Sequence, residues 1–244
     1  MNPSSQHTHV KAMILAAGLG TRLKPLTDVK PKALLEINGT TLLEMAVAHL
    51  VQAGVKEIIV NVHHFADQVI DFLKQKENFG VDITVFDESG QLLDTGGGLK
   101  KAADFFGDGR PFIVRNVDLV SDLDFSKMMG FHLMHSPLAT LAVRNRETSR
   151  YFLFDDSDQL AGWTNTKTGE TLQSRESRGV IRKLAFSGIQ IIDPKIFPLI
   201  TEEGKFSLTG LYLRLAKNEK IICYEDNFSK WKDIGKSIHD LDDE

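Results

Sequence analysis

The sequence has little of three features that define large classes of protein. It contains one cysteine, Cys223, in 244 residues, so no disulfide can form within the chain, and a reducing compartment such as the cytoplasm is expected. No apolar run approaches the roughly 20 residues that span a bilayer, which predicts no membrane association. Basic side chains are fewer than acidic ones, 29 against 33, for a net charge of −4. This deficit argues against a nucleic-acid partner, because phosphate backbones attract basic surfaces.

The remaining composition is that of a globular protein, with 42% hydrophobic and 25% charged residues. Residues 1–10 are polar and lack the hydrophobic segment of a secretory signal, so we expect a disordered leader there. No linker and no internal repeat interrupts residues 11–244. We therefore expect a single domain, in which the pattern of secondary structure loosens after residue 137.

Short apolar runs alternate with amphipathic stretches in the first half of the chain. The pattern predicts strands at 13–17, 57–62, 81–86 and 111–116, and helices after Thr41 and at 65–76 and 98–106. Thr41 and Glu44 have the spacing of a capping box. Such an order predicts a Rossmann-like three-layer α/β/α sandwich with a mainly parallel mixed sheet. Later, we expect a polar loop at 165–178, a helix at 206–216, and strands at 138–143, 151–154, 160–164, 186–192, 221–224 and 231–234.

The strongest chemical signal is a glycine turn directly after the first predicted strand. It reads Leu15-Ala16-Ala17-Gly18-Leu19-Gly20-Thr21-Arg22-Leu23, followed by Pro25-Leu26-Thr27 and Lys30-Pro31-Lys32. A turn of this kind exposes backbone N–H groups that hold phosphates, and Arg22 and Lys32 add positive charge. The dinucleotide fingerprint is excluded because Leu23 replaces its third glycine. A P-loop is excluded because no Gly-Lys-Ser/Thr occurs.

This string resembles the signature of the sugar-1-phosphate nucleotidyltransferases. Four further pieces resemble later motifs of that family, in family order: Asp94-Thr95-Gly96-Gly97-Gly98, Asn116-Val117-Asp118, Phe186-Ser187-Gly188-Ile189 and Trp231-Lys232-Asp233-Ile234-Gly235. The resemblance covers nearly the whole chain. It implies a GT-A-like nucleotidyltransferase fold, with a nucleotide-binding part at about 11–137 and a sugar-binding part at about 138–244.

The resemblance also assigns roles to individual residues. Arg22 and Lys32 are expected to be catalytic, Asp118 and Asp233 to bind Mg²⁺, and Lys32, Ser187 and Gly188 to bind the sugar phosphate. Nucleotide binding is expected at Ala16, Ala17, Gly18, Leu19, Gly20, Thr21, Arg22, Thr95, Gly96, Gly97 and Asn116. The implied reaction joins an NTP to a sugar 1-phosphate and releases pyrophosphate. The chemistry agrees, since attack at phosphorus needs positioning and charge neutralisation, and Mg²⁺ favours one or two carboxylates plus phosphate oxygens.

Two departures from the family pattern narrow the expected substrate. Val117 stands where the family usually has glycine, which either narrows the space beside the ribose or is tolerated by the backbone. The Glu-Lys-Pro element of many relatives is absent between residues 144 and 185, as in smaller members that act on muramate, heptose or choline phosphates. We expect N-acetylmuramate 1-phosphate with UTP first, and heptose or mannose 1-phosphate with GTP second. A phosphocholine cytidylyltransferase and a non-catalytic paralogue that binds nucleotide sugars remain alternatives, and a homodimer is possible.

Several other side chains allow both a functional and a plain structural interpretation. His63 and His64 are expected to be loop histidines near the ligand pocket. Trp163 either stacks on a sugar or base or belongs to the core. Arg144, Arg146 and Arg150 form a basic cluster near the expected acceptor loop, where they either bind phosphate or face solvent.

Overall fold

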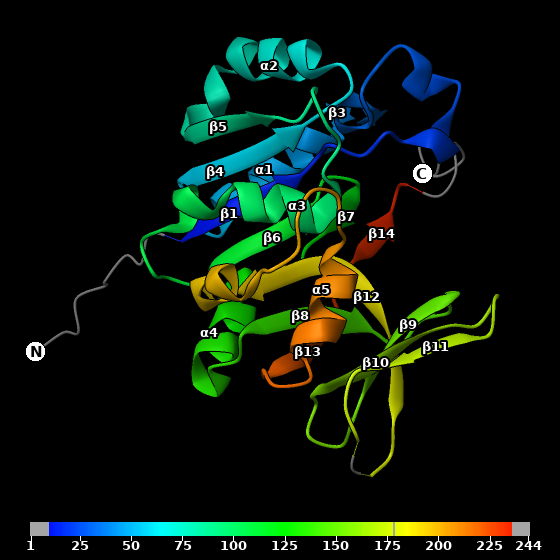
Figure 1. Ribbon diagram of the computed structural model, residues 1–244. Helices are drawn as coiled ribbons and strands as arrows, with labels where there is room; N and C mark the ends of the chain where they lie inside the picture. Colours follow the sequence, from blue (N-terminus) through cyan, green and yellow to red (C-terminus); the bar gives the residue numbers. More distant parts are fainter. Residues whose placement is uncertain (1–9, 178, 236–244) are drawn as a thin grey trace, which may run out of the picture.

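The computed structural model describes residues 10–177 and 179–235. Residues 1–9 of the expected leader therefore lie outside the described part. A ten-stranded sheet runs through the molecule in the order β11-β10-β9-β12-β6-β1-β4-β5, and β8 and β13 continue from β12 off this path (Figure 1). Two small ribbons stand apart from it: β2 (Glu36–Ile37) with β3 (Thr40–Thr41), and β7 (Leu119–Ser121) with β14 (Trp231–Asp233).

The first half of the chain forms the parallel part of the sheet. Its strands are β1 (Lys11–Leu15), β4 (Glu57–Val62), β5 (Asp82–Asp87) and β6 (Phe112–Asn116), all parallel to their neighbours in this half. Parallel strands need crossovers, which are supplied by α1 (Leu42–Gln52), α2 (Ala66–Gln75) and α3 (Asp94–Lys101). The expected α/β/α fold is thus confirmed.

The layers follow from the alternation of side chains along each strand. On β1, Ala12 and Ile14 enter one hydrophobic cluster, which also contains apolar residues of α1, α2 and α4 (Phe125–His135). Met13 and Leu15 enter the other cluster, with residues of α3 and α5 (Leu208–Leu215). Because successive side chains of a strand point to opposite faces, one apolar strand is covered on both sides by helices.

The helices begin and end where local chemistry favours it. The N–H of Glu44 donates to the hydroxyl of Thr41 at 3.1 Å, so the expected cap of α1 is present. Gly54 follows the end of α1 with φ +84°, a backbone conformation that glycine adopts without strain.

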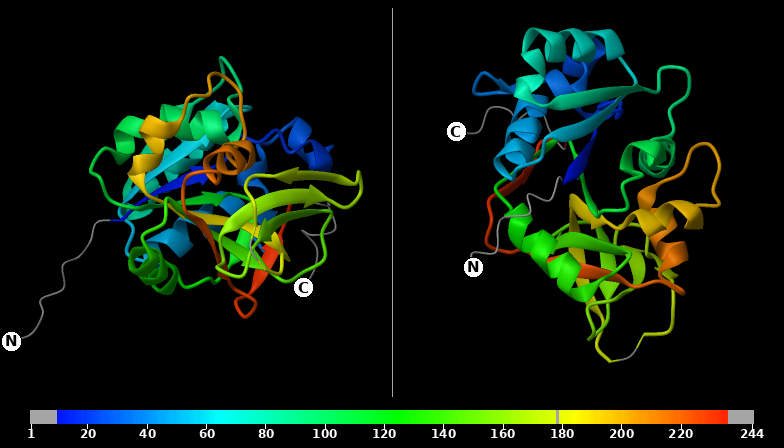
Figure 2. Two further views of the ribbon diagram at one scale, coloured as in Figure 1. Left: turned by 60° about the horizontal axis from the view of Figure 1, so that its bottom comes forward. Right: turned by 90° about the vertical axis from the view of Figure 1, so that its left-hand side faces the viewer.

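The second half of the chain is mainly antiparallel and is organised around one long strand, β12 (Arg182–Ile192). It pairs with β6, β8 (Ala139–Arg144) and β9 (Arg150–Phe154), and β13 (Ile221–Glu225) lies parallel to β8. Strands β9, β10 (Leu160–Asn165) and β11 (Glu170–Gln173) form a wing that projects from the end of the molecule opposite α2 (Figures 1 and 2).

The short strands β2, β3 and β7 were not expected from the sequence, and three longer segments also differ from their assignments. The expected loop at 165–178 contains β11, an edge strand whose residues are all exposed, so no hydrophobic alternation marks it. The expected helix at 98–106 begins earlier, at Asp94, and gives way to a 3-10 turn at Ala103–Phe106. Helix α4 was not expected, although the side chain of Asp124 caps it through the N–H of Lys127 at 3.0 Å.

Within residues 10–177 and 179–235, no helix combines the length and the apolar character needed to cross a membrane.

Candidate active site

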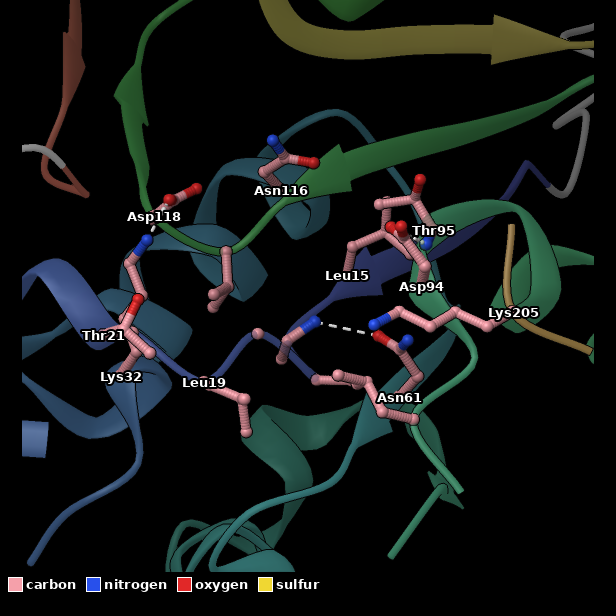
Figure 3. A pocket seen from close by; sticks show the side chains of 16 residues that line it. Leu15, Leu19, Thr21, Lys32, Asn61, Asp94, Thr95, Asn116, Asp118 and Lys205 are labelled. Carbon is pink, nitrogen blue, oxygen red and sulfur yellow. Dashed lines mark hydrogen bonds and ion pairs between the residues drawn. The ribbon is translucent and has the colours of Figure 1, made fainter. Parts of the chain in front are cut away.

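A pocket of about 390 Å³ opens at the carboxyl ends of β1, β4 and β6, where an α/β sheet usually binds ligands. We call it the strand-end pocket (Figure 3). It is lined by Leu15, Ala16, Ala17, Gly18, Leu19, Gly20, Thr21, Lys32, Asn61, Leu92, Asp94, Thr95, Asn116, Val117, Asp118 and Lys205. Segments far apart in the sequence therefore meet at one edge of the sheet.

The glycine turn after β1 is braced by the two short motifs that follow it. Gly20 has φ +61°, and a Cβ there would lie 2.8 Å from Cγ2 of Thr27 and 3.2 Å from Cβ of Lys32. The hydroxyl of Thr27 donates to the carbonyl of Gly20 at 2.9 Å. Around Gly18, by contrast, a Cβ would meet nothing within 4 Å. Thr27 and Lys32 thus pack against the turn at Gly20, whereas the space beside Gly18 is open.

A buried polar network fixes the floor of the pocket. The N–H of Ala16 donates to Oδ1 of Asn61 at 2.8 Å, and Nδ2 of Asn61 donates to Oε1 of Glu88 at 2.8 Å. The other carboxylate oxygen of Glu88 accepts from the N–H of Leu93 at 3.2 Å. Asn61 and Glu88 are each 2% exposed, so these bonds are protected from water and hold the turn against β4 and α3.

Two carboxylates and an ammonium group converge beside the end of the pocket that Lys32 and Asp118 line. Lys32 and Asp118 form an ion pair, in which Lys32 is largely buried. A Cβ at Gly235 would lie 2.5 Å from Oδ2 of Asp118, 2.5 Å from Nζ of Lys32 and 3.1 Å from Oδ1 of Asp233. The three charged groups therefore surround one point, although their residues come from three separate parts of the chain.

The turn that carries Asp118 is held from below by a fully buried arginine. Arg115 donates to the carbonyls of Asn116 at 3.3 Å and Leu119 at 2.5 Å, and to Nδ1 of His49 at 2.9 Å. Burial lowers the pKa of Arg115 to about 10, and the nearby charge of Asp118 opposes that shift. Burial and the charge of Arg115 lower the pKa of His49 to about 4. A neutral His49 can therefore accept from the cationic Arg115.

Val117 lines the strand-end pocket from the middle of this turn. It is 4% exposed, packs into the hydrophobic cluster on the α1 side of the sheet, and does not have a left-handed backbone. The backbone here accommodates a side chain, and a narrowing of the space beside the ribose by Val117 stays a prediction.

Most of the residues expected to bind nucleotide line the pocket. Arg22 directly follows Thr21, which lines the pocket, but Arg22 itself does not line it. The side chain of Arg22 is exposed. Gly96 and Gly97 are buried: a Cβ on Gly96 would lie 2.4 Å from the ring of Phe206, and one on Gly97 would lie 2.5 Å from the carbonyl oxygen of Gly204. Their small size serves the packing of residues 204–206, and a role in nucleotide binding stays a prediction.

Ser187 and Gly188 form a bulge in β12, where the register shifts between Phe186 and Gln190. Gly188 has φ +76°, and a Cβ on it would lie 2.6 Å from Cδ1 of Leu119. Ser187 is 1% exposed, and its carbonyl accepts from Nε1 of Trp231 at 2.9 Å. The bulge contacts β7, which directly follows Asp118, and β14, which contains Asp233. A direct role in binding sugar phosphate remains a prediction.

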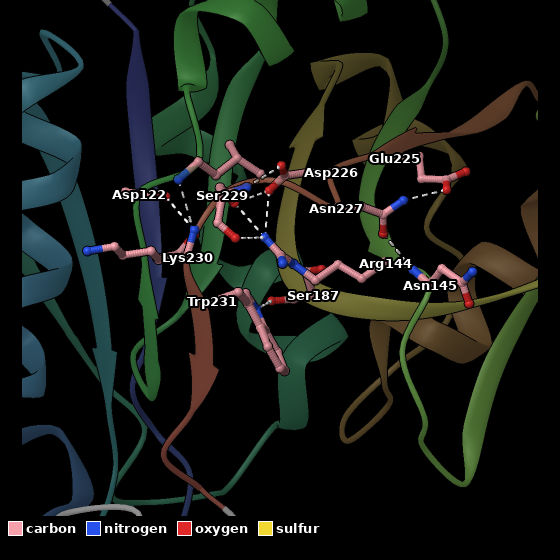
Figure 4. A network of polar contacts seen from close by, with 12 residues as sticks. Asp122, Arg144, Asn145, Ser187, Glu225, Asp226, Asn227, Ser229, Lys230 and Trp231 are labelled. Atoms are coloured by element: carbon pink, nitrogen blue, oxygen red, sulfur yellow. Dashed lines mark hydrogen bonds and ion pairs between the residues drawn. The ribbon is translucent and has the colours of Figure 1, made fainter. Parts of the chain in front are cut away.

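A second pocket, which we call the arginine pocket, lies where β8 and β14 approach each other. It is lined by Arg144, Asn145, Arg146, Asn227 and Trp231, of which Arg144, Asn145, Asn227 and Trp231 are labelled in Figure 4. Arg144 is neutralised by Asp226 at 2.9 Å and also donates to the carbonyl of Ser229 at 2.7 Å. Arg146 stacks over the ring of Trp231 with its guanidinium carbon 4.3 Å from the ring centroid.

Some contributors to the site were not expected from the sequence. Asn61, Leu92 and Lys205 line the strand-end pocket. The one visible signal was Asn61, a polar residue inside an otherwise β-branched strand. His63 bonds through Nδ1 to the carbonyl of Glu88 at 2.7 Å, and neither His63 nor His64 lines this pocket. Trp163 is partly buried against the cluster on the α5 side, which favours its interpretation as a core residue.

Comparison with known proteins gives consistent matches. The model of a family described as nucleotidyl transferase matches residues 11–241. N-acetylmuramate alpha-1-phosphate uridylyltransferases from Caulobacter vibrioides and Neisseria meningitidis are 34% and 30% identical to this chain. The matches cover 92% and 93% of this chain and 91% and 93% of those proteins.

A solved structure, that of HddC from Yersinia pseudotuberculosis in complex with GMP-PN, superposes with a TM-score of 0.74 at 24% identity. The match covers 95% of this chain and 96% of that one. At this identity the likeness establishes the shared fold alone.

Proposed function

This chain belongs to the nucleotidyl transferase family, and we propose that it joins UTP to N-acetylmuramate 1-phosphate. In the proposed reaction a phosphate oxygen of the sugar 1-phosphate attacks the α-phosphorus of UTP in line. The bond between the α-phosphorus and the bridging oxygen to the β-phosphorus breaks, and pyrophosphate leaves with that electron pair. No general base is needed because the attacking oxygen is already anionic. The cytoplasm, expected from the single cysteine, is the proposed compartment.

The glycine turn is the proposed seat of the triphosphate. Its open front, at Gly18, leaves backbone N–H groups free to approach phosphate oxygens, and Thr21 lies at the same end of the pocket. Arg22 is exposed one residue further on, so its long side chain is within reach of the leaving pyrophosphate. Lys32, which is held against Asp118 in the structure, is assigned to the α-phosphate and the incoming phosphate.

The proposed Mg²⁺ ligands are Asp118 and Asp233. Their oxygens, with the ammonium of Lys32, surround a single point near Gly235. No group of three or more His, Cys, Asp or Glu side chains suited to a metal occurs among the described residues, so phosphate oxygens and water would complete the shell, as Mg²⁺ prefers. When bound, the ion neutralises charge on the phosphates. In the structure the ammonium of Lys32 pairs with Asp118, which supports a carboxylate placed to be held beside a cation.

The arginine pocket is the observation that supports N-acetylmuramate 1-phosphate as the acceptor. Trp231 and Asp233 are two residues apart on β14, so their side chains share one face about 7 Å apart. That spacing is comparable to one sugar ring. A sugar whose phosphate lies at Asp233 and Lys32 would therefore extend toward Trp231 and Arg146.

Arg146 is suited to recognise an anionic group on that sugar. It forms no ion pair with any residue that the structure describes, whereas Arg144 beside it is neutralised by Asp226. Its Nη2 donates only to a carbonyl, that of Phe186 at 3.0 Å. Burial lowers the pKa of Arg146, and the charge of Asp233 opposes this shift. N-acetylmuramate carries a lactyl carboxylate that N-acetylglucosamine and mannose lack, and a guanidinium binds carboxylate strongly.

The test is to measure pyrophosphate release with UTP, GTP and CTP against several sugar 1-phosphates, for the wild type and for Arg146→Met. We expect the wild type to favour UTP with N-acetylmuramate 1-phosphate. Loss of a charged hydrogen bond should lower kcat/KM for this acceptor about 10- to 100-fold and leave the slower rate with N-acetylglucosamine 1-phosphate unchanged.

Arg150→Met is the matched control, since it removes the same charge from an exposed position outside the arginine pocket. It should leave both rates unchanged. A wild type that prefers mannose 1-phosphate with GTP, or an equal loss with both amino sugars in Arg146→Met, would overturn the proposed acceptor.

A further inference from the structure

Lys205 enters the strand-end pocket from a segment remote from its other walls. We propose that the ammonium of Lys205 donates to O4 of uracil or thymine, or to O6 of guanine, so that these keto bases are selected over the amino bases cytosine and adenine, which carry an amino group at that position. This inference rests on the proposed nucleotide site, and it concerns a residue that none of the recognised motifs contains.

The position of Lys205 separates it from the phosphate end of the pocket. Thr21, Lys32 and Asp118 lie together at one end, and Asn61, Asp94, Thr95 and Lys205 lie together at the other (Figure 3). With phosphates on the glycine turn and beside Asp118, the base falls to the second end.

The backbone of Lys205 is fixed because its neighbours bind the N-terminal end of α3. The N–H of Phe206 donates to the carbonyl of Leu93 at 3.2 Å, and the carbonyl of Phe206 accepts from the N–H of Gly96 at 2.9 Å. The N–H of Leu208 donates to the hydroxyl of Thr95 at 2.9 Å. The close packing of residues 204–206 on Gly96 and Gly97 leaves no room for a side chain. The lysine therefore projects from an anchored support.

The charge of Lys205 is not neutralised by its own segment. Glu202 is bound to Arg214 at 2.5 Å, and Glu203 is bound to Lys100 at 2.6 Å. Lys205 forms no ion pair with any residue in the described ranges. Its three N–H donors are therefore available to a ligand.

The Asn61 amide at this end of the pocket cannot adapt to an amino base. Both ends of the Asn61 amide are engaged, its oxygen by the N–H of Ala16 and its nitrogen by Glu88, so Asn61 cannot rotate to accept from an exocyclic amino group. An ammonium group facing such an amino group would place donor against donor. Facing O4 of uracil, or O6 of guanine, it makes a charge-assisted hydrogen bond.

The experiment compares kcat/KM for UTP and CTP in the full-length protein and in three variants, with binding of each nucleotide measured separately by calorimetry. In Lys205→Met, we expect kcat/KM with UTP to fall about 10- to 100-fold, with CTP unchanged, so the preference for UTP collapses. In Lys205→Glu, a carboxylate can accept from cytosine, and CTP should become the better substrate. Lys217→Met, at an exposed position on the surface, should match the wild type.

Equal losses with UTP and CTP in Lys205→Met would assign the lysine to the phosphates and overturn the inference. An unchanged UTP-to-CTP ratio would overturn it as well. Absence of turnover with every acceptor would instead count against the proposed function. The binding constants for UTP and CTP would still separate the keto from the amino base and so decide the role of Lys205.

Discussion

Gly96 is a residue where one added methyl group should have a large structural consequence. It lies in the first turn of α3, whose N–H groups lack partners within the helix. The carbonyl of Phe206 accepts from the N–H of Gly96 at 2.9 Å and from that of Gly97 at 3.3 Å. A Cβ on Gly96 would lie 2.4 Å from the ring and 2.9 Å from this carbonyl oxygen. The Gly96→Ala side chain can therefore fit only if the segment moves and the cap is lost.

The size of the effect follows from three contributions. Overpacking costs about 1–3 kcal/mol, and loss of a helix cap costs about 1 kcal/mol. The better helix propensity of alanine returns about 1 kcal/mol. We expect Gly96→Ala to lower the free energy of unfolding by about 2 kcal/mol, which lowers Tm by roughly 4–8 °C for a chain of this size. Urea and thermal unfolding measure both quantities.

Gly130→Ala is the matched control for this experiment. Gly130 is exposed inside α4, and a Cβ there would meet nothing within 4 Å. The same methyl group should therefore stabilise the protein by roughly 0.5–1 kcal/mol. If Gly96→Ala were as stable as the wild type, the packing of residues 204–206 on α3 would not be what requires glycine.

Two further predictions concern the carboxylates and the buried histidines. Asp118→Asn should lower kcat about 100- to 1,000-fold and leave UTP binding nearly unchanged. Asp71→Asn, on the surface of α2, is the control and should leave kcat unchanged. Substantial activity in Asp118→Asn would remove Asp118 from the mechanism. His132 is 1% exposed and burial lowers its pKa to about 4, so the unfolded chain takes up a proton first, and stability falls as pH decreases from about 7 toward 4. Between pH 7 and 5 the free energy of unfolding of the wild type should fall by about 1–2 kcal/mol more than that of His132→Asn. Urea unfolding at both pH values measures this difference, and equal losses in the two proteins would contradict the prediction.

The parallel half of the fold could be predicted because its signals are local. A buried strand that runs into glycines and a strand that ends on Asp118 each predict a position at the carboxyl edge of the sheet, and the structure brings Asp118 and Lys32 into contact. Strand β11 could not be predicted because all of its side chains are exposed. Helix α3 was placed too late because three successive glycines disfavour a helix, and only the packing of residues 204–206 makes one there.

The candidate site was predictable where the chain itself repeats a known pattern, and not where distant segments meet. Asn61 and Glu88 are separated by 27 positions, and neither belongs to a motif. In the sequence Lys205 cannot be distinguished from other exposed lysines. Its backbone position depends on hydrogen bonds between its neighbour Phe206 and residues 93–97, which only the structure reveals. Contacts of this kind depend on tertiary structure, and no periodicity in the sequence records them.

The ribbon of β7 and β14 determines at what stage of folding the candidate active site is completed. It pairs Asp233 with Leu119 across more than a hundred positions, and contacts between such distant positions form late because loop closure opposes them. During synthesis the glycine turn, β6 and Asp118 emerge well before residues 231–235. The proposed second carboxylate therefore arrives only with the last described strand, and a chain that has not completed this ribbon holds a nucleotide pocket without a finished catalytic centre.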